Sequence, residues 1–143
     1  MPSIRRTVVA AKPVETVFSY LADFANAVEW DAGTVSCRRL SGDGGVGTTY
    51  ENVSSFRGRQ TTLTYQVMEY VEDERLVLRG ANKSVTAVDT MIFEAVSEGT
   101  RVTYNADFTF KGIAAMLTPF LKGPLAKLGD EAERSLAAAL ARL

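Results

Sequence analysis

The segment from Gly112 to Leu143 constrains the fold more than any other part of the sequence, because it has the pattern of a long amphipathic helix. At about 100° per residue, its apolar side chains fall within one arc about 120° wide. These side chains are Leu125, Leu128, Ala132, Leu136, Ala139, Leu140 and Leu143. A helix from Leu125 to Leu143 rises about 27 Å, enough to cross a small domain. One side of this helix must therefore be covered by another layer of the protein.

Glycine and proline divide the same segment into two helical parts. The apolar residues of the first part, which also repeat at helical spacing, are Ile113, Met116, Leu117, Phe120 and Leu121. Pro119 lacks the N–H group for a helical hydrogen bond, so it should kink this part. Gly123 suits the left-handed conformation after a helix end, and Pro124 suits the first turn of the next helix. We predict a short, kinked helix that leads into a long, straight one, on which Asp130 and Arg134 form an ion pair.

Length and charge indicate a single globular domain with no electrostatic preference for polyanions. The chain has 143 residues, of which 46% are apolar, as expected of one domain that spans residues 1–143. With a net charge of −1, the chain has no overall electrostatic attraction to nucleic acid or to an anionic membrane surface. No apolar run approaches about 18 residues and the N-terminus lacks a signal-peptide core. We therefore expect no stable membrane insertion and a cytoplasmic location.

The content of cysteine and histidine excludes several kinds of active site. Cys37 is the single cysteine, so no intrachain disulfide can form, and histidine is absent. The absence of histidine excludes His-based triads, Cys–His dyads and His-ligated metal sites. The acidic run 72–74 is typical of a solvated hairpin tip rather than of a calcium site. We predict neither a metal nor a cofactor, and a homodimer stays open.

The residues before the helical segment predict a strand, two short helices and six further strands. Residues 3–11 are β-rich, Pro13 then opens a helix, and Asp23 caps a second short helix that runs to about Glu29. The residues expected inward on these two helices are Val14, Val17, Phe18, Leu21, Phe24 and Val28. Patterns of period two then predict strands near 34–41, 46–56, 59–71, 75–81, 85–96 and 100–110.

Short polar turns connect these strands, which favours an antiparallel meander. A meander with one dry face needs a cover, and the long helix has the matching apolar stripe. The predicted fold class is α+β: a seven-stranded curved antiparallel sheet wrapped around a long C-terminal helix, with two short helices after the first strand.

Alternation along four strands indicates which side chains face the long helix. With the third strand the least clear, they are Tyr50, Asn52, Ser54, Phe56, Leu63, Tyr65, Val67, Ala87, Asp89, Met91, Phe93, Ala95, Val102, Tyr104, Ala106, Phe108 and Phe110. Buried tyrosine hydroxyls need partners, and polar groups such as Asp89 and Asn52 are costly to bury in a dry core. The facing side of the helix carries small residues, at Gly129, Ala132 and Ala139. Rings, polar groups and a wall of small side chains indicate a ligand cavity.

Two plainer interpretations stay open at this point. An aromatic stripe on a strand is more often core than ligand site. Asp89 can also lie at a strand end in water, because a register shift of one residue would turn its side chain outward.

Five short motifs lie at or near the ends of the predicted helices and strands. They are 12–18 (KPVETVF), 21–24 (LADF), Trp30, 45–48 (GVGT) and 99–104 (GTRVTY). With the terminal helix, they resemble the START-like, helix-grip superfamily in its bacterial polyketide cyclase/dehydrase and lipid-transport branch. The resemblance covers essentially the whole chain. Its motifs are specific for the fold and weak for the activity.

The resemblance implies a deep, mostly apolar cavity between the sheet and the long helix. Members bind lipids, sterols, polyketides, aromatic metabolites or plant hormones, and a minority catalyse cyclisation or dehydration. The expected ligand-binding residues are Trp30, Tyr50, Phe56, Tyr65, Asp89, Met91, Phe93, Tyr104, Phe108, Phe110, Met116, Phe120, Leu128 and Ala132. For Trp30, which should lie between the short helices and the sheet, rim packing and ligand contact are equally open.

Three functions follow from this sequence. The first is binding of a hydrophobic small molecule, as a carrier or sensor. The second is a polyketide cyclase or dehydratase that uses the same cavity, with Asp89 as acid or base and with Tyr50, Tyr65 and Tyr104 orienting carbonyl groups. The third is a protein-interaction domain with a filled core. Whether the protein is an enzyme is left undecided by the sequence.

Overall fold

The computed structural model describes residues 2–143, without the side chains of Leu117 and Thr118. Within these residues one antiparallel sheet has the strand order β1-β7-β6-β5-β4-β3-β2. The strands are β1 (Ser3–Ala10), β2 (Thr34–Ser41), β3 (Thr49–Phe56), β4 (Arg59–Val71), β5 (Arg75–Ala81), β6 (Val85–Val96) and β7 (Gly99–Phe110). The predicted place of Leu117 in an apolar stripe lies outside the described side chains.

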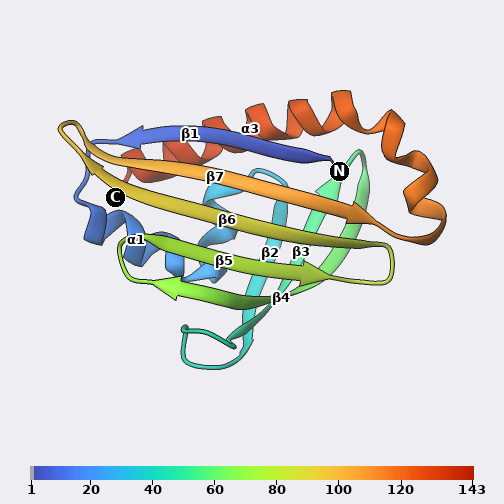
Figure 1. Ribbon diagram of the computed structural model, residues 1–143, viewed down its shortest axis with the longest axis horizontal. Helices are drawn as coiled ribbons and strands as arrows, with labels where there is room; N and C mark the ends of the chain where they lie inside the picture. The colour runs from blue at the N-terminus through green and yellow to red at the C-terminus, as the bar shows by residue number, and fades with distance from the viewer. Residues whose placement is uncertain (1) are drawn as a thin grey trace.

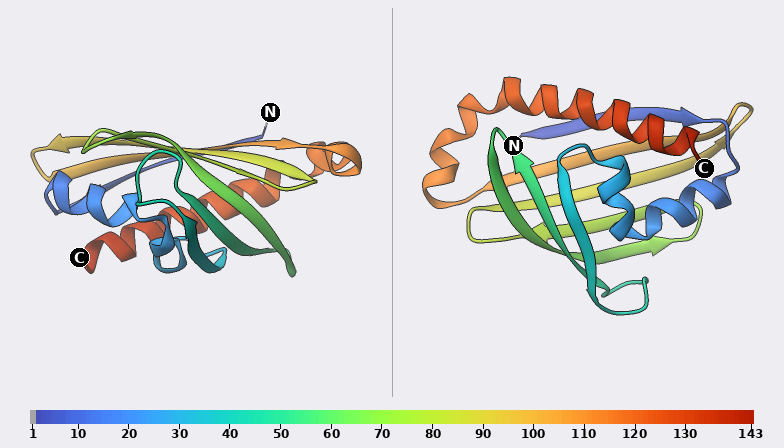
Figure 2. Two further views of the ribbon diagram at one scale, coloured as in Figure 1. Left: turned by 90° about the horizontal axis from the view of Figure 1, so that it is seen from below. Right: turned by 180° about the vertical axis from the view of Figure 1, so that it is seen from behind.

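Helices cover one face of this sheet. They are α1 (Val14–Ala22), the 3₁₀ turn η1 (Phe24–Asn26), α2 (Ala27–Trp30) and α3 (Lys122–Ala141), and the 3₁₀ segment η2 (Gly112–Phe120) connects β7 to α3. Figure 1 shows α3 running behind β1 and β7, and Figure 2 shows α1 and α3 on the same side of the sheet. The helix-grip arrangement predicted from the sequence is therefore confirmed.

The predicted strands agree closely with the observed ones. The bounds of β2, β4, β5 and β6 match the predicted ranges, and β7 begins one residue earlier than predicted. The strand predicted from residue 46 begins instead at Thr49, because the glycine-rich residues 42–47 form a turn in which Gly42, Gly44 and Gly47 have positive φ. Side-chain alternation and turn glycines thus locate most strand ends.

Irregular pairing bends the sheet around the helix. The register of β2 on β3 shifts twice, and that of β4 on β5 shifts between Val67 and Glu69. Bulges of this kind increase the local twist of a strand. As a result β2, β3 and the first half of β4 turn across the direction of β5–β7 (Figures 1 and 2). The curvature opens the space in which the candidate site lies.

Several local predictions about packing were wrong. Val28 is 48% exposed, because the single turn of α2 already places Ala27 and Trp30 on its buried face. Ala95 is exposed, next to the hairpin that ends β6. Asp130 pairs across the fold with Arg6, at 2.9 Å, and not with Arg134 on its own helix.

The division between the two helical parts also differs from the prediction. Gly123 lies inside the first turn of α3 and has no positive φ; the left-handed glycine of this region is Gly112, with a φ of 59°. The first part, η2, is a 3₁₀ segment containing Pro119. The tighter 3₁₀ helix uses different hydrogen bonds from the kinked α-helix that was predicted.

Candidate functional site

Two adjacent hollows lie between the sheet and the N-terminal half of α3. The inner one is a cavity of about 90 Å³. The outer one is a wider recess of about 470 Å³ that opens to the surface beside Pro124 and Lys127. Both are lined by Gly33, Ser55, Phe56 and Leu128. These shared residues lie between the recess and the cavity, and we call them the neck.

Five strands, β1, β3, β4, β6 and β7, contribute side chains to the inner cavity. Its lining residues are Ile4, Asp31, Gly33, Asn52, Ser54, Ser55, Phe56, Leu63, Tyr65, Asp89, Tyr104, Phe108, Leu128 and Ala132. The alternation predicted for β3, β4, β6 and β7 places their side chains on this face. Apolar walls with a few polar groups are the usual composition of a small-molecule site.

Asp89 is the most unusual group in the cavity. It is only 5% exposed, and the Tyr104 hydroxyl donates a hydrogen bond to its Oδ2 atom at 3.3 Å. Burial raises the pKa of Asp89 to about 7, and the nearby charge of Asp31 adds to this rise, while the hydrogen bond from Tyr104 opposes it. The interpretation of Asp89 as a solvated strand-end carboxylate is therefore wrong.

Asp31 brings a second carboxyl group to the same cavity. Its Oδ1 accepts a hydrogen bond from the Gly33 amide at 3.1 Å, and its Oδ2 accepts one from the Thr34 hydroxyl at 3.0 Å. Asn52 donates in turn to the Thr34 hydroxyl at 3.2 Å. Burial raises the pKa of Asp31, and the hydrogen bonds from Gly33 and Thr34 work in the opposite direction. The network holds this carboxyl group in place at the start of β2.

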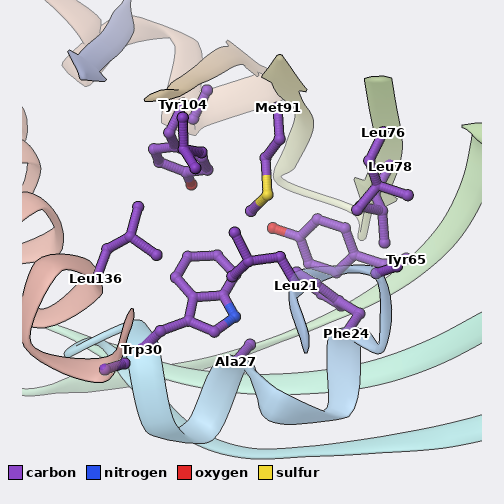
Figure 3. Close-up of a cluster of buried hydrophobic side chains, with 14 of the residues drawn as sticks. Leu21, Phe24, Ala27, Trp30, Tyr65, Leu76, Leu78, Met91, Tyr104 and Leu136 are labelled. Atoms are coloured by element: carbon purple, nitrogen blue, oxygen red, sulfur yellow. The ribbon is translucent and has the colours of Figure 1, made fainter. Parts of the chain in front are cut away.

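Tyr65 fits tightly against the neighbouring strand. It pairs with Gly80 of β5, and a Cβ atom on Gly80 would lie 2.6 Å from the Tyr65 ring. The ring is 7% exposed, and burial raises the pKa of its hydroxyl well above 10. Figure 3 shows the Tyr65 hydroxyl pointing toward the side chain of Met91.

The structure brings about half of the predicted ligand-binding residues together around the cavity. Those that line it are Phe56, Tyr65, Asp89, Tyr104, Phe108, Leu128 and Ala132. Met91 and Phe93 are buried in the core, and Phe93 packs edge-on against Phe18. Phe110 stacks beside Phe108 outside the lining.

The other predicted residues lie farther away. Trp30 is 1% exposed and packs edge-on against Tyr104 at 5.8 Å, behind the cavity wall. Its Nε1 has no hydrogen-bond partner within the described residues. Tyr50 is buried and contributes to a separate hollow beside α1. Met116 and Phe120 are 75% and 74% exposed on η2 and line neither hollow.

Sequence reasoning did not assign several lining residues to the site. Asn52, Ser54 and Leu63 were expected inward but not as site residues, whereas Ile4, Asp31, Gly33 and Ser55 were not assigned to the site. A signal for Asp31 exists in the sequence. An Asp-x-Gly step after a helix end is typical of a turn in which the carboxylate accepts backbone hydrogen bonds.

Comparison with solved structures identifies the same fold in proteins of very different sequence. A Thermus thermophilus protein superposes with a TM-score of 0.81 at 15% identity, with 97% of each chain covered. The Zhui aromatase/cyclase of a Streptomyces species gives a TM-score of 0.79 at 14% identity, covering 99% of this chain and 92% of its own. A START superfamily protein from Mycobacterium smegmatis gives 0.75 at 18% identity, covering 98% and 94%.

The sequence was also compared with curated proteins and with protein-family models. No curated protein is similar enough in sequence to count as a match. Among residues 2–143, no helix has both the length and the hydrophobicity needed to cross a membrane. The family model described as polyketide cyclase / dehydrase and lipid transport matches residues 1–143. The chain therefore belongs to the polyketide cyclase / dehydrase and lipid transport family.

Proposed function

We propose that this protein binds a hydrophobic small molecule, such as a lipid, a polyketide or an aromatic metabolite, between the sheet and α3, as a carrier or sensor. The observation that carries the proposal is a cavity between the sheet and α3 that shares Gly33, Phe56 and Leu128 with a surface recess. The family description, which includes lipid transport, supports it.

The sizes of the two hollows suit an elongated ligand. A cavity of about 90 Å³ holds a headgroup or a small ring, and a recess of about 470 Å³ holds the remainder. Taken together, they fall in the range of about 300–1,000 Å³ that is usual for small-molecule sites. Ile4, Leu63 and Phe108 supply apolar surface in the inner part. Burial of apolar ligand surface against these walls would drive binding.

The test uses the neutral, apolar dye N-phenyl-1-naphthylamine, whose fluorescence rises in a dry environment. Ala132 lies on the cavity wall, so Ala132→Phe places a ring inside the cavity. We expect the dye to bind the native protein and to bind Ala132→Phe at least about tenfold more weakly. Ala137→Phe makes the same change on the exposed side of α3 and should leave binding unchanged.

Two outcomes would overturn the proposal: no dye binding by the native protein, or equal affinity in both variants. Circular dichroism checks that Ala132→Phe is folded. If it is not, Leu128→Phe narrows the neck from a half-buried position and takes its place in the comparison.

A second candidate function, a cyclase or dehydratase, is favoured by Asp89. A carboxyl group whose pKa is about 7 is present in both forms near neutral pH, and Asp89 faces the cavity beside the Tyr104 hydroxyl. As a carboxylate it can take the proton from the carbon between a hydroxyl-bearing carbon and a carbonyl. As the resulting acid it can protonate the departing hydroxyl, so that water leaves and a double bond forms.

This second function is tested with a β-hydroxy ketone whose dehydration to the enone is followed by absorbance. Turnover that Asp89→Asn abolishes, while dye binding persists, is the expected result for an enzyme. Turnover unchanged in Asp89→Asn would exclude the role. The third function needed a filled core, and the cavity between the sheet and α3 argues against it. The cytoplasmic location, a homodimer, and the absence of nucleic-acid binding, metal and cofactor stay predictions.

A further inference from the structure

The inner cavity combines negative charge with hydrogen-bond acceptors, and no cationic side chain belongs to its described lining. Asp31, just before β2, and Asp89, on β6, both belong to this lining. Cationic side chains near it lie elsewhere: Arg6 is paired with Asp130, and Arg57 and Lys127 line the outer recess. An occupant of the inner cavity therefore meets carboxyl groups that no cationic side chain of the described lining pairs with.

The second, independent observation is the hydroxyl group of Tyr65. Tyr65 as a residue is 7% exposed, and it belongs to the cavity lining. Among the described hydrogen bonds none involves its hydroxyl, whereas the Tyr104 hydroxyl is bound to Asp89. The Tyr65 hydroxyl is not among the fully buried atoms that lack a partner, so it is available to form a hydrogen bond with a molecule in the cavity.

Hydrogen-bonding capacity is also left over on Asp89. Its Oδ2 accepts from Tyr104, while none of the described groups donates to Oδ1. Asp31 differs, because both of its oxygens already accept hydrogen bonds from residues at the start of β2. Free acceptors at Asp89 beside an unpartnered hydroxyl at Tyr65 match a ligand group that donates hydrogen bonds.

Building on the proposed ligand-binding function, we propose that the inner cavity binds the hydrogen-bond-donating headgroup, a hydroxyl or protonated amine, of an apolar molecule and excludes carboxylate headgroups. Asp89 is the specificity-determining residue, and Tyr65 provides a second hydrogen-bonding contact to the headgroup. Asp31 adds to the negative electrostatic potential of the cavity. The apolar remainder of the ligand extends through the neck into the outer recess.

The physical reason is the low polarity of the site. Like charges repel much more strongly inside a protein than in water, so a ligand carboxylate would be rejected by Asp31 and Asp89. A donor group instead satisfies acceptors that are costly to leave unpaired. Charge complementarity therefore decides which end of a lipid-like molecule enters first.

The experiment compares three molecules with the same apolar chain: octylamine, 1-octanol and octanoate. Each displaces N-phenyl-1-naphthylamine from the native protein at about pH 8, where the amine is protonated and the acid ionised. We expect octylamine and 1-octanol to displace the dye at least about tenfold more effectively than octanoate. In Asp89→Asn, which keeps the shape of the side chain, the ratio of octylamine to octanoate affinity should fall at least about tenfold.

Matched variants complete the test. Asp43→Asn removes one negative charge from an exposed loop and should keep the native ratio. Asp31→Asn provides a second variant of the cavity if Asp89→Asn does not fold. Octanoate binding as tightly as octylamine, or an unchanged ratio in both cavity variants, would overturn this inference. Because the dye is measured first, failure of the dye to bind identifies the different case in which the ligand-binding function itself is wrong.

Discussion

The two ends of α3 carry the same apolar pattern but are covered in different ways. At the C-terminal end, Leu136, Ala139 and Leu140 are fully buried, and Leu136 lies beside Trp30 (Figure 3). At the N-terminal end, Leu128 is half-buried and faces both hollows. We call these the closed end and the open end of the groove. One helix thus has a dry half and a half that leaves room for a ligand.

The difference comes from the residues opposite the helix rather than from the helix itself. At the closed end, η1 and α2 insert Phe24 and Trp30 between the sheet and α3, and their rings lie 6.3 Å apart, edge to face. At the open end, the turn at Gly33 and the end of β3 border a hollow beside Leu128. An amphipathic pattern shows which side of a helix is covered. How closely it is covered depends on the partner.

The largest expected effect concerns the closed end. Trp30→Ala should lower the free energy of unfolding by about 3–5 kcal/mol, because it leaves a cavity at a fully buried site and removes support from Tyr104. Denaturant unfolding measures this change. Trp30→Phe should cost much less, since it keeps a ring and removes an N–H group that has no partner in the described structure. A loss below about 1 kcal/mol in Trp30→Ala would show that this end is not closed by Trp30.

The next largest effect concerns Asp89, which lies in the inner cavity at the open end. The pKa of Asp89 is raised from 3.8 to about 7, so between these values the folded state holds a proton that the unfolded state has released. Stability should therefore fall as pH rises through this window, by roughly 4 kcal/mol at most. Asp89→Asn should be more stable than the native protein at about pH 8, and the gain should shrink toward about pH 4.

Denaturant unfolding of both proteins across this pH range gives the measurement. Asp43→Asn, in an exposed loop, controls for the loss of one negative charge. A difference between Asp89→Asn and the native protein that does not change with pH would contradict the raised pKa of Asp89.

Sequence reasoning succeeded where side chains follow a period and failed where they do not. Alternation placed Tyr65, Asp89 and Tyr104 on the inner face, and helical spacing placed Leu128 and Ala132 opposite them. No period governs a loop, so the contribution of the turn at residues 31–33 was missed. The exposed positions of Met116 and Phe120 were also missed, because helical spacing does not show whether a short segment reaches the sheet.

A matched pair of substitutions tests the two ends directly. Leu136→Ala and Leu128→Ala make the same change on the same helix, at 2% exposure and in a half-buried position respectively. We expect a loss of about 3 kcal/mol for Leu136→Ala and about 1 kcal/mol for Leu128→Ala, because removing atoms beside an existing hollow loses fewer contacts. Equal losses, measured by denaturant unfolding, would mean that the two ends are packed alike.

The smallest expected effect concerns the apolar segment next to the open end. Phe120 is 74% exposed, so Phe120→Ser should change the free energy of unfolding by no more than about 0.5 kcal/mol. Its dye affinity should also match that of the native protein, since Phe120 lines neither hollow. Titration and unfolding of this single variant measure both quantities. A clear loss of dye affinity in Phe120→Ser would place the segment over the ligand and would extend the open end beyond the neck at Leu128.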